Sequence, residues 1–112
     1  DRILQVLTNL LSNSLKFTEP HTGTIKIHLE DGDKALRVSV EDNGRGVPLE
    51  DQAYIFDKFY QSKNQNTKKP QGSGLGLAIC KKIVEGHKGS IWVDKGFKKG
   101  ARLVFELPKS RN

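Results

Sequence analysis

Two asparagines and a lysine near the start of the chain have types and spacings that can hold a metal ion and an anion. Asn9, Asn13 and Lys16 fall on one side of a predicted helix, the side that we expect to lie opposite its leucines. Because asparagine is a poor helix former, two of them within one helix call for a reason. An amide oxygen can ligate a hard cation such as Mg2+, and a lysine can contact phosphate oxygens. The alternative, which this pattern taken alone favours, is a solvent-facing side with two neutral asparagines.

A carboxylate stands where an alternating apolar segment ends. Asp42 continues the inward side of residues 36–40, so we expect its side chain to point at an apolar wall, where an unpaired charge is costly. Gly44 and Gly46 follow closely, and glycines let the backbone turn tightly and approach a ligand. A buried carboxylate of this kind can accept hydrogen bonds from a flat, amine-bearing ring such as adenine. The alternative is an ordinary Asp-Asn-Gly turn that closes a strand.

Glycines open a second predicted helix. Free backbone N–H groups and the positive end of a helix dipole make such a segment a natural phosphate site. It is not a Walker A loop, because no Gly-Lys followed by Ser or Thr is present, and it is not a dinucleotide fingerprint, because no strand precedes it. A flexible hinge is the alternative. The segment consists of Gly72, Ser73, Gly74, Leu75, Gly76 and Leu77.

Hydrophobic periodicity predicts the elements that position these residues. Two segments have the period of an amphipathic helix, and four shorter ones alternate as strands of two hairpins. The predicted helices are 2–17 and 75–85, and the predicted strands are 24–30, 36–42, 89–94 and 101–107, with turns at 31–33 and 96–100. The apolar positions are Ile3, Leu4, Leu7, Leu10, Leu11 and Leu15 in the first helix and Ile25, Ile27 and Leu29 on one side of the first strand.

These elements predict an α/β sandwich of the α+β class, in which helices pack on one face of a mixed, largely antiparallel sheet. Residues from 45 to about 73 lose this periodicity, apart from a short apolar cluster. A long structureless stretch within a compact domain is usually functional, so we expect this one to act as a lid. The apolar cluster consists of Tyr54, Ile55, Phe56, Phe59 and Tyr60.

Length and composition indicate one soluble globular domain that spans residues 1–112. No apolar run approaches the roughly 20 residues of a membrane helix, and no signal peptide is recognisable, so we expect a cytoplasmic domain without membrane insertion. The net charge is +6, but no aromatic residues alternate with the clustered lysines, which argues against nucleic-acid binding. Cys80 lies among apolar residues and is expected to be packed, with no catalytic role.

Four segments, taken in order, resemble a known family. They are QVLTNLLSNSLKFT (residues 5–18), DNGRGV (42–47), IFDKFY (55–60) and GSGLGLAI (72–79). They are similar to the N, G1, F and G2 boxes of histidine kinase catalytic domains, and the resemblance runs from residue 1 to about 108. It implies the Bergerat-type ATP-binding fold of the GHKL superfamily, which also includes type II topoisomerases, a heat-shock chaperone class and mismatch-repair ATPases.

The resemblance also implies roles for individual residues. Asn13 is expected to ligate Mg2+ with Asn9 beside it, and Lys16 is expected to reach the phosphates. Asp42 is expected to bind the adenine amino group. The nucleotide pocket is expected to be shaped and lined by Phe17, Gly44, Gly46, Val47, Phe59 and Tyr60, and the phosphates to be bordered by Gly72, Ser73, Gly74, Leu75, Gly76 and Leu77.

A histidine kinase domain binds Mg2+ and ATP and presents the γ-phosphate for transfer to a histidine on a separate dimerisation domain, with a response regulator downstream. Many family members carry an arginine just after the F box, where this sequence has Gln61. Lys58 or Lys63 is a candidate to replace it as a catalytic cation, and solvated lysines are an equal alternative. The sequence also leaves open a regulatory nucleotide-binding module without kinase activity and a serine kinase of the anti-sigma-factor type.

The chain departs from the family pattern in three respects. It has no segment like the family's phosphoacceptor motif, and we expect its histidines to be structural or exposed instead. The family domain normally has a helix and a strand before the segment that begins here, so we expect a sheet that lacks an edge strand. Gly86 and Lys88 replace the usual Leu or Met before a histidine and the usual Gly after it, which makes this helix end hard to predict. The histidines are His21, His28 and His87.

Overall fold

The predicted order of elements, helix, hairpin, helix and hairpin, is confirmed by a computed structural model that describes residues 2–57 and 76–109. One short 3-10 helix, η1, lies in the segment that we expected to lack structure. The elements are α1 (Arg2–Phe17), β1 (Ile25–Asp31), β2 (Ala35–Asp42), η1 (Leu49–Asp51), α2 (Gly76–Gly86), β3 (Ser90–Val93) and β4 (Ala101–Pro108).

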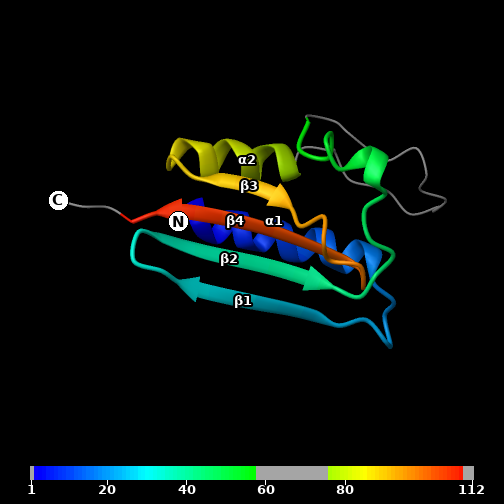
Figure 1. The fold of residues 1–112 in the computed structure, drawn as a ribbon. Helices are drawn as coiled ribbons and strands as arrows, with labels where there is room; N and C mark the ends of the chain where they lie inside the picture. Colours follow the sequence, from blue (N-terminus) through cyan, green and yellow to red (C-terminus); the bar gives the residue numbers. More distant parts are fainter. Residues whose placement is uncertain (1, 58–75, 110–112) are drawn as a thin grey trace.

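The strands form one sheet in the order β1-β2-β4-β3, and both helices pack on one of its faces (Figure 1). Every strand pair within the described residues is antiparallel. β4 lies between β2 and β3, although it comes last in the chain. This crossover places Ala101, at the start of β4, opposite Asp42, at the end of β2.

The hydrophobic core lies between the two helices and the sheet. Val6 and Leu10 of α1 are fully buried against α2 and the central strands. Burial of such side chains contributes roughly 1.5–3 kcal/mol each. The other buried core residues are Val38, Val40, Cys80, Ile83, Val84, Val93, Leu103 and Phe105.

The buried side of α1 differs from the predicted one. We counted Leu4 and Leu15 among its inward residues, but these side chains are 61% and 67% exposed. Their separation is close to three helical turns, so both lie on the same flank of the helix. The buried side is instead centred on Val6, Leu10 and Ser14, which follow each other at intervals of four residues.

The prediction for the first strand is also partly wrong. Ile25 packs against the core, but Ile27 and Leu29 are 49% and 65% exposed. Both lie opposite core valines of β2, so they point toward the helix-bearing side of the sheet, beyond the part that the helices cover. β1 is an end strand, and its outer edge pairs with no other strand of the described residues.

The end of α2, which was hard to predict, is a Schellman motif. The N–H of Lys88 donates to the carbonyl of Glu85 and the N–H of Gly89 donates to the carbonyl of Val84, each at 2.9 Å. Lys88 has a φ of 66°, in the left-handed region that glycine normally occupies. No helix among the described residues has both the length and the hydropathy needed to cross a membrane.

Candidate functional site

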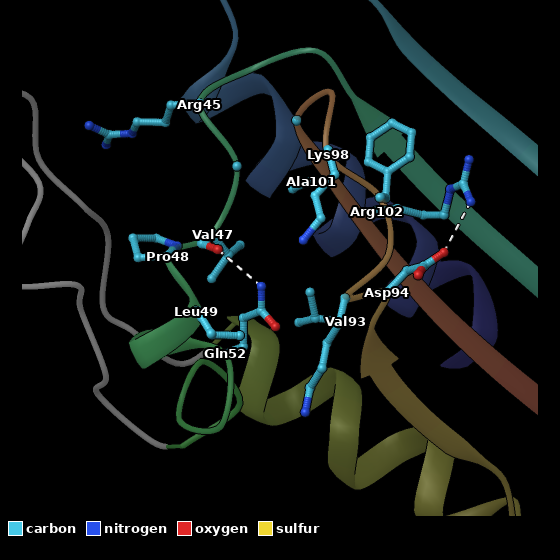
Figure 2. Close-up of a pocket in the computed structure, with 14 residues that line it drawn as sticks. Arg45, Val47, Pro48, Leu49, Gln52, Val93, Asp94, Lys98, Ala101 and Arg102 are labelled. Carbon is cyan, nitrogen blue, oxygen red and sulfur yellow. Dashed lines mark hydrogen bonds and ion pairs between the residues drawn. The ribbon is translucent and has the colours of Figure 1, made fainter.

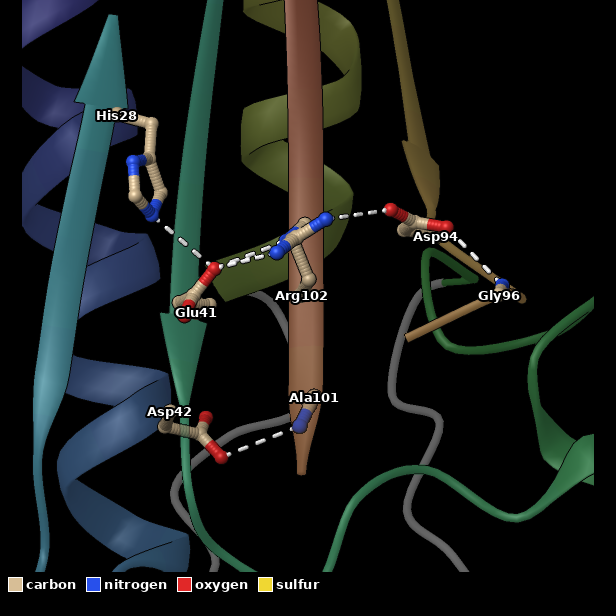
Figure 3. A network of polar contacts seen from close by, with 7 residues as sticks. All are labelled: His28, Glu41, Asp42, Asp94, Gly96, Ala101 and Arg102. Atoms are coloured by element: carbon tan, nitrogen blue, oxygen red, sulfur yellow. Dashed lines mark hydrogen bonds and ion pairs between the residues drawn. The ribbon is translucent and has the colours of Figure 1, made fainter. Parts of the chain in front are cut away.

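Asp42 ends β2 as a buried carboxylate, with only 5% of the residue exposed. Its Oδ1 accepts a hydrogen bond from the N–H of Gly44 at 2.9 Å. It also accepts one from the N–H of Ala101 at 3.3 Å (Figure 3). Its Oδ2 makes no hydrogen bond within the part of the chain that the structure describes. One oxygen is thus fixed by the backbone, while the other remains an acceptor for a donor such as an amine.

Two glycines let the backbone close around this carboxylate. Gly46 has a φ of 77°, and a Cβ atom there would lie 2.9 Å from the carbonyl oxygen of Gly100. A Cβ atom at Gly100 would lie 2.0 Å from the carbonyl oxygen of Asp42, so no side chain fits there. We had assigned Gly44 and Gly46 to the pocket from the sequence. Gly100 and Ala101 were missed, because only the pairing of β4 with β2 brings them to Asp42.

Asn43 ties the segment that follows α1 to the end of β2, a role that sequence reasoning also missed. Its Oδ1 accepts a hydrogen bond from the N–H of Thr24 at 2.8 Å, and its Nδ2 donates to the carbonyl of Thr22 at 3.1 Å. The backbone N–H of Asn43 also donates to the carbonyl of Thr24. The asparagine next to Asp42 therefore fixes where α1 meets this end of the sheet.

Asn9 faces α2, although we had expected the polar side of α1 to lie opposite the leucines. Asn9 and Asn13 are half-buried, and Nδ2 of Asn9 lies 3.4 Å from the carbonyl oxygen of Gly76, the first residue of α2. Lys16 is exposed in the last turn of α1. Asn9, one of the two asparagines predicted for the site, thus lies beside the described end of the glycine segment. Leu77 is half-buried and packs against the core.

Several predicted site residues lie outside the described residues. Of the expected lid, 45 to about 73, the structure describes only the part up to residue 57, which includes η1. The predictions for the remainder, and for the side chain of Phe17, stay predictions. The residues concerned are Lys58, Phe59, Tyr60, Gln61, Lys63, Gly72, Ser73, Gly74 and Leu75.

A pocket of about 270 Å³ lies between residues 45–52 and the hairpin 93–102 (Figure 2). Lys98 points into it, whereas Arg45 points away. Nε2 of Gln52 donates to the carbonyl of Val47 at 3.1 Å, and its Oε1 is buried without a partner among the described residues. Asp42 does not line this pocket. The pocket nevertheless adjoins the carboxylate site, because Gly46 and Ala101 form part of the walls of both.

A chain of charged residues crosses the face of the sheet that carries no helices (Figure 3). Oε1 of Glu41 lies 3.1 Å from Nε2 of His28 and 2.7 Å from Nη2 of Arg102, and Nη1 of Arg102 lies 3.0 Å from Oδ2 of Asp94. Burial opposes ionisation of Glu41, but the hydrogen bond and charge of Arg102, aided by His28, outweigh it and lower the pKa of Glu41 below its usual 4.5. The hydrogen bond to Glu41 raises the pKa of Arg102, which stays charged.

Cys80 is fully buried, as its apolar surroundings predicted. Its Sγ lies 3.6 Å from the carbonyl oxygen of Val6, across the contact between the two helices. Burial raises the pKa of this thiol to about 11, although a hydrogen bond with Asn9 acts in the opposite direction. A protonated, buried thiol is a packing residue and not a nucleophile.

Comparison with known proteins decides the family. The chain matches the family described as "Histidine kinase-, DNA gyrase B-, and HSP90-like ATPase" over residues 1–111. The chain belongs to this family. Two curated relatives are much longer than this chain, which spans 18% of the length of each. Sensor histidine kinase WalK of Bacillus subtilis (strain 168) is 43% identical over 110 residues, which are 96% of this chain. Sensor protein SrrB of Staphylococcus aureus (strain NCTC 8325 / PS 47) is 39% identical over 109 residues, which are 97% of this chain.

Solved structures share this ATPase fold. The catalytic domain of histidine kinase ThkA is 40% identical with a TM-score of 0.82, and the match covers 98% of this chain and 69% of that one. Full-length ShkA, in complex with AMPPNP, is 33% identical with a TM-score of 0.82, and the match covers 99% of this chain and 22% of that one. The predicted fold and the predicted kinship with histidine kinase catalytic domains are both confirmed.

Proposed function

We propose that this chain binds ATP together with Mg2+ and presents the γ-phosphate for transfer to a histidine of a separate dimerisation domain. The process is cytoplasmic two-component signalling, with a response regulator as the next acceptor. The observation that carries this proposal is the Asp42 carboxylate, which is buried in a domain of an ATPase family with one oxygen fixed and the other open to an amine.

The residues around Asp42 fit an adenine nucleotide. An acceptor oxygen at a nearly buried position favours a donor such as the adenine amino group over a carbonyl. The tight backbone at Gly46 and Gly100 leaves no room for side chains beside it. We propose that Gly44 and Val47 complete the adenine side of the pocket, that Asn9 lies beside the metal ligand Asn13, and that Lys16 reaches the phosphates.

Asn13 is the metal ligand that we propose. Within the described residues, no group of three His, Cys, Asp or Glu side chains is arranged to hold a metal ion. An amide oxygen and the phosphate oxygens of the nucleotide are the hard ligands that Mg2+ prefers. Bound there, Mg2+ would neutralise phosphate charge, which is the chief requirement of phosphoryl transfer.

The phosphoacceptor is proposed to lie on another domain. Two of the histidines already have local partners, since His28 contacts Glu41 and Nδ1 of His87 lies 2.9 Å from the carbonyl oxygen of Ile83. His21 lies exposed in the turn after α1. The named relatives are far longer than this chain, and such proteins have room for a dimerisation domain.

Incubation of this chain and its cognate dimerisation domain with radiolabelled ATP tests the transfer. We expect an acid-labile phosphoryl group on the dimerisation domain, because phosphohistidine hydrolyses in acid, and no label without this chain. Absence of label despite nucleotide binding would contradict the kinase proposal and leave a regulatory nucleotide-binding module. An acid-stable product would instead indicate a serine kinase.

A further inference from the structure

Arg102 occupies the centre of the charged chain that crosses the face of the sheet without helices, here called the open face (Figure 3). Its Nε and Nη2 both donate to Oε1 of Glu41, at 3.0 and 2.7 Å, and its Nη1 donates to Oδ2 of Asp94 at 3.0 Å. The guanidinium also stacks on the ring of Phe97, 4.3 Å from its centroid. One side chain thus joins β2, β4 and the turn that follows β3.

This guanidinium lies one residue from the proposed nucleotide site. In the register of β2 and β4, Glu41 pairs with Arg102 and Asp42 pairs with Ala101. Alternation along a strand sends Glu41 and Arg102 to the open face and Asp42 to the helix-bearing face. The ion pair and the carboxylate are therefore on opposite faces of adjacent rungs of the same strand pair.

The Asp42–Ala101 rung is the last of its ladder and needs support. The hydrogen bond from the N–H of Ala101 to Oδ1 of Asp42 is 3.3 Å long, and no further β2–β4 pair lies beyond it. Strand ends fray unless they are tied down. The neighbouring rung is closed by a forked arginine–carboxylate contact, and its charge-assisted hydrogen bonds hold this end of the ladder.

The other contacts of Arg102 fix the turn that delivers Gly100 and Ala101. Asp94 accepts from Arg102 through Oδ2 and from the N–H of Gly96 through Oδ1, at 3.0 Å each. With Phe97 stacked on the guanidinium, both the start and the middle of the turn are tied to one side chain. The close approach of Gly100 to the backbone of Asp42 depends on that turn.

We infer that Arg102 is a positioning residue for adenine recognition. It holds the rung next to Asp42 and the 94–100 turn, so that the N–H of Ala101 keeps Oδ1 occupied and leaves Oδ2 directed at the adenine amine. This inference rests on the proposed function, since it concerns how Asp42 selects an amine-bearing base.

The test compares Arg102→Gln with a matched control, Arg37→Gln. Arg37 forms the same kind of contact on the same strand pair and face, with Nη2 3.0 Å from Oε2 of Glu106, and lies over Trp92. It belongs to the opposite end of β2. Calorimetry measures the dissociation constants of a non-hydrolysable ATP analogue and its inosine counterpart, which has a carbonyl in place of the amine. Hydrogen exchange of the Ala101 amide is measured by NMR.

Arg102→Gln is expected to weaken binding of the adenine analogue about fivefold to tenfold, which corresponds to the loss of about one ordinary hydrogen bond. Binding of the inosine analogue should change far less, so that discrimination between the bases falls, and the Ala101 amide should exchange faster. Arg37→Gln should change neither the discrimination nor this exchange rate. Arg102→Lys, which keeps the charge but not the fork, is expected to restore part of the discrimination.

Three results would overturn the inference. One is that Arg102→Gln discriminates between the two bases as well as the wild type does. If that variant does not fold, the same result in Arg102→Lys counts instead. Another is an equal loss of discrimination in Arg37→Gln, which would mean a general effect of stability. If the wild-type chain binds neither analogue, both the proposed function and the inference are contradicted. If the wild type binds and Asp42→Asn does not, while Arg102→Gln discriminates as the wild type does, the inference alone fails.

Discussion

Glu41 and Asp42 are adjacent carboxylates with different environments. Glu41 lies on the open face, where Arg102 and His28 contact it, and Asp42 lies on the helix-bearing face, where two backbone N–H groups contact it. Alternation along β2 alone sends the two side chains to opposite faces. The carboxylate with charged partners is suited to hold strands together, and the one with an open oxygen is suited to bind a ligand.

Replacement of Glu41 by glutamine is expected to change how stability depends on pH. The pKa of Glu41 is lowered in the folded state, so its ionised form contributes stability above the usual pKa of 4.5, and this contribution is lost as the pH falls through the lowered value. Glu41→Gln should therefore be less stable than the wild type at pH 7. The difference should shrink toward pH 3. Urea denaturation of both chains at several pH values measures it, and a constant difference would contradict the assigned ion pair.

The orientation of Asp42 could be predicted from the sequence, but its partner could not. The alternating pattern places Asp42 with the inward valines, and it is nearly buried, as expected. The hydrogen bond from Ala101 spans 59 positions in the chain and depends on the register of two strands that no local pattern specifies. The same holds for Arg102, whose partners Glu41 and Asp94 come from other parts of the chain.

At the scale of the elements, local periodicity predicted the helices and strands well and the covered surfaces less well. The helix 2–17 has the predicted bounds, and each strand lies within one or two residues of the predicted range. The errors at Leu15 and Leu29 have different causes: Leu15 lies on a flank of α1 away from its buried side, whereas Leu29 lies on the inward side of β1, beyond the helices. An apolar residue on the inward side is buried only where another element lies over it, and packing between elements decides where that is.

The helix end at Lys88 gives a prediction about stability. A side chain at a φ of 66° is strained, and glycine at this position of a Schellman motif is not. Lys88→Gly is expected to raise the free energy of unfolding by about 0.5–1 kcal/mol, partly offset by the greater freedom of glycine in the unfolded chain. Lys88→Ala, which also removes the charge but keeps the Cβ atom, should show no such gain. Urea denaturation midpoints measure both, and a gain in the alanine variant alone would contradict the explanation.

At the scale of the whole molecule, the fold brings together residues that are far apart in the chain. The crossover puts β4 beside β2, so that Ala101 reaches Asp42, and α2 packs on α1, so that Gly76 reaches Asn9. The resemblance of four sequence segments to histidine kinase boxes predicted this fold correctly, and the family match and the solved relatives confirm it. The individual roles proposed for the site residues follow from geometry and family kinship, and binding measurements are their test.

The central claim is that Asp42 binds the base of a magnesium-bound adenine nucleotide. Isothermal titration calorimetry of the wild-type chain with Mg2+ and a non-hydrolysable ATP analogue tests it most directly. We expect one binding site per chain and a loss of affinity of about tenfold or more in Asp42→Asn, because the open oxygen becomes an N–H2 donor that opposes the adenine amine. Asp33→Asn, which removes the same charge from the exposed turn between β1 and β2, should bind as the wild type does. A wild-type chain that does not bind, or an Asp42→Asn variant that binds equally well, would contradict the account.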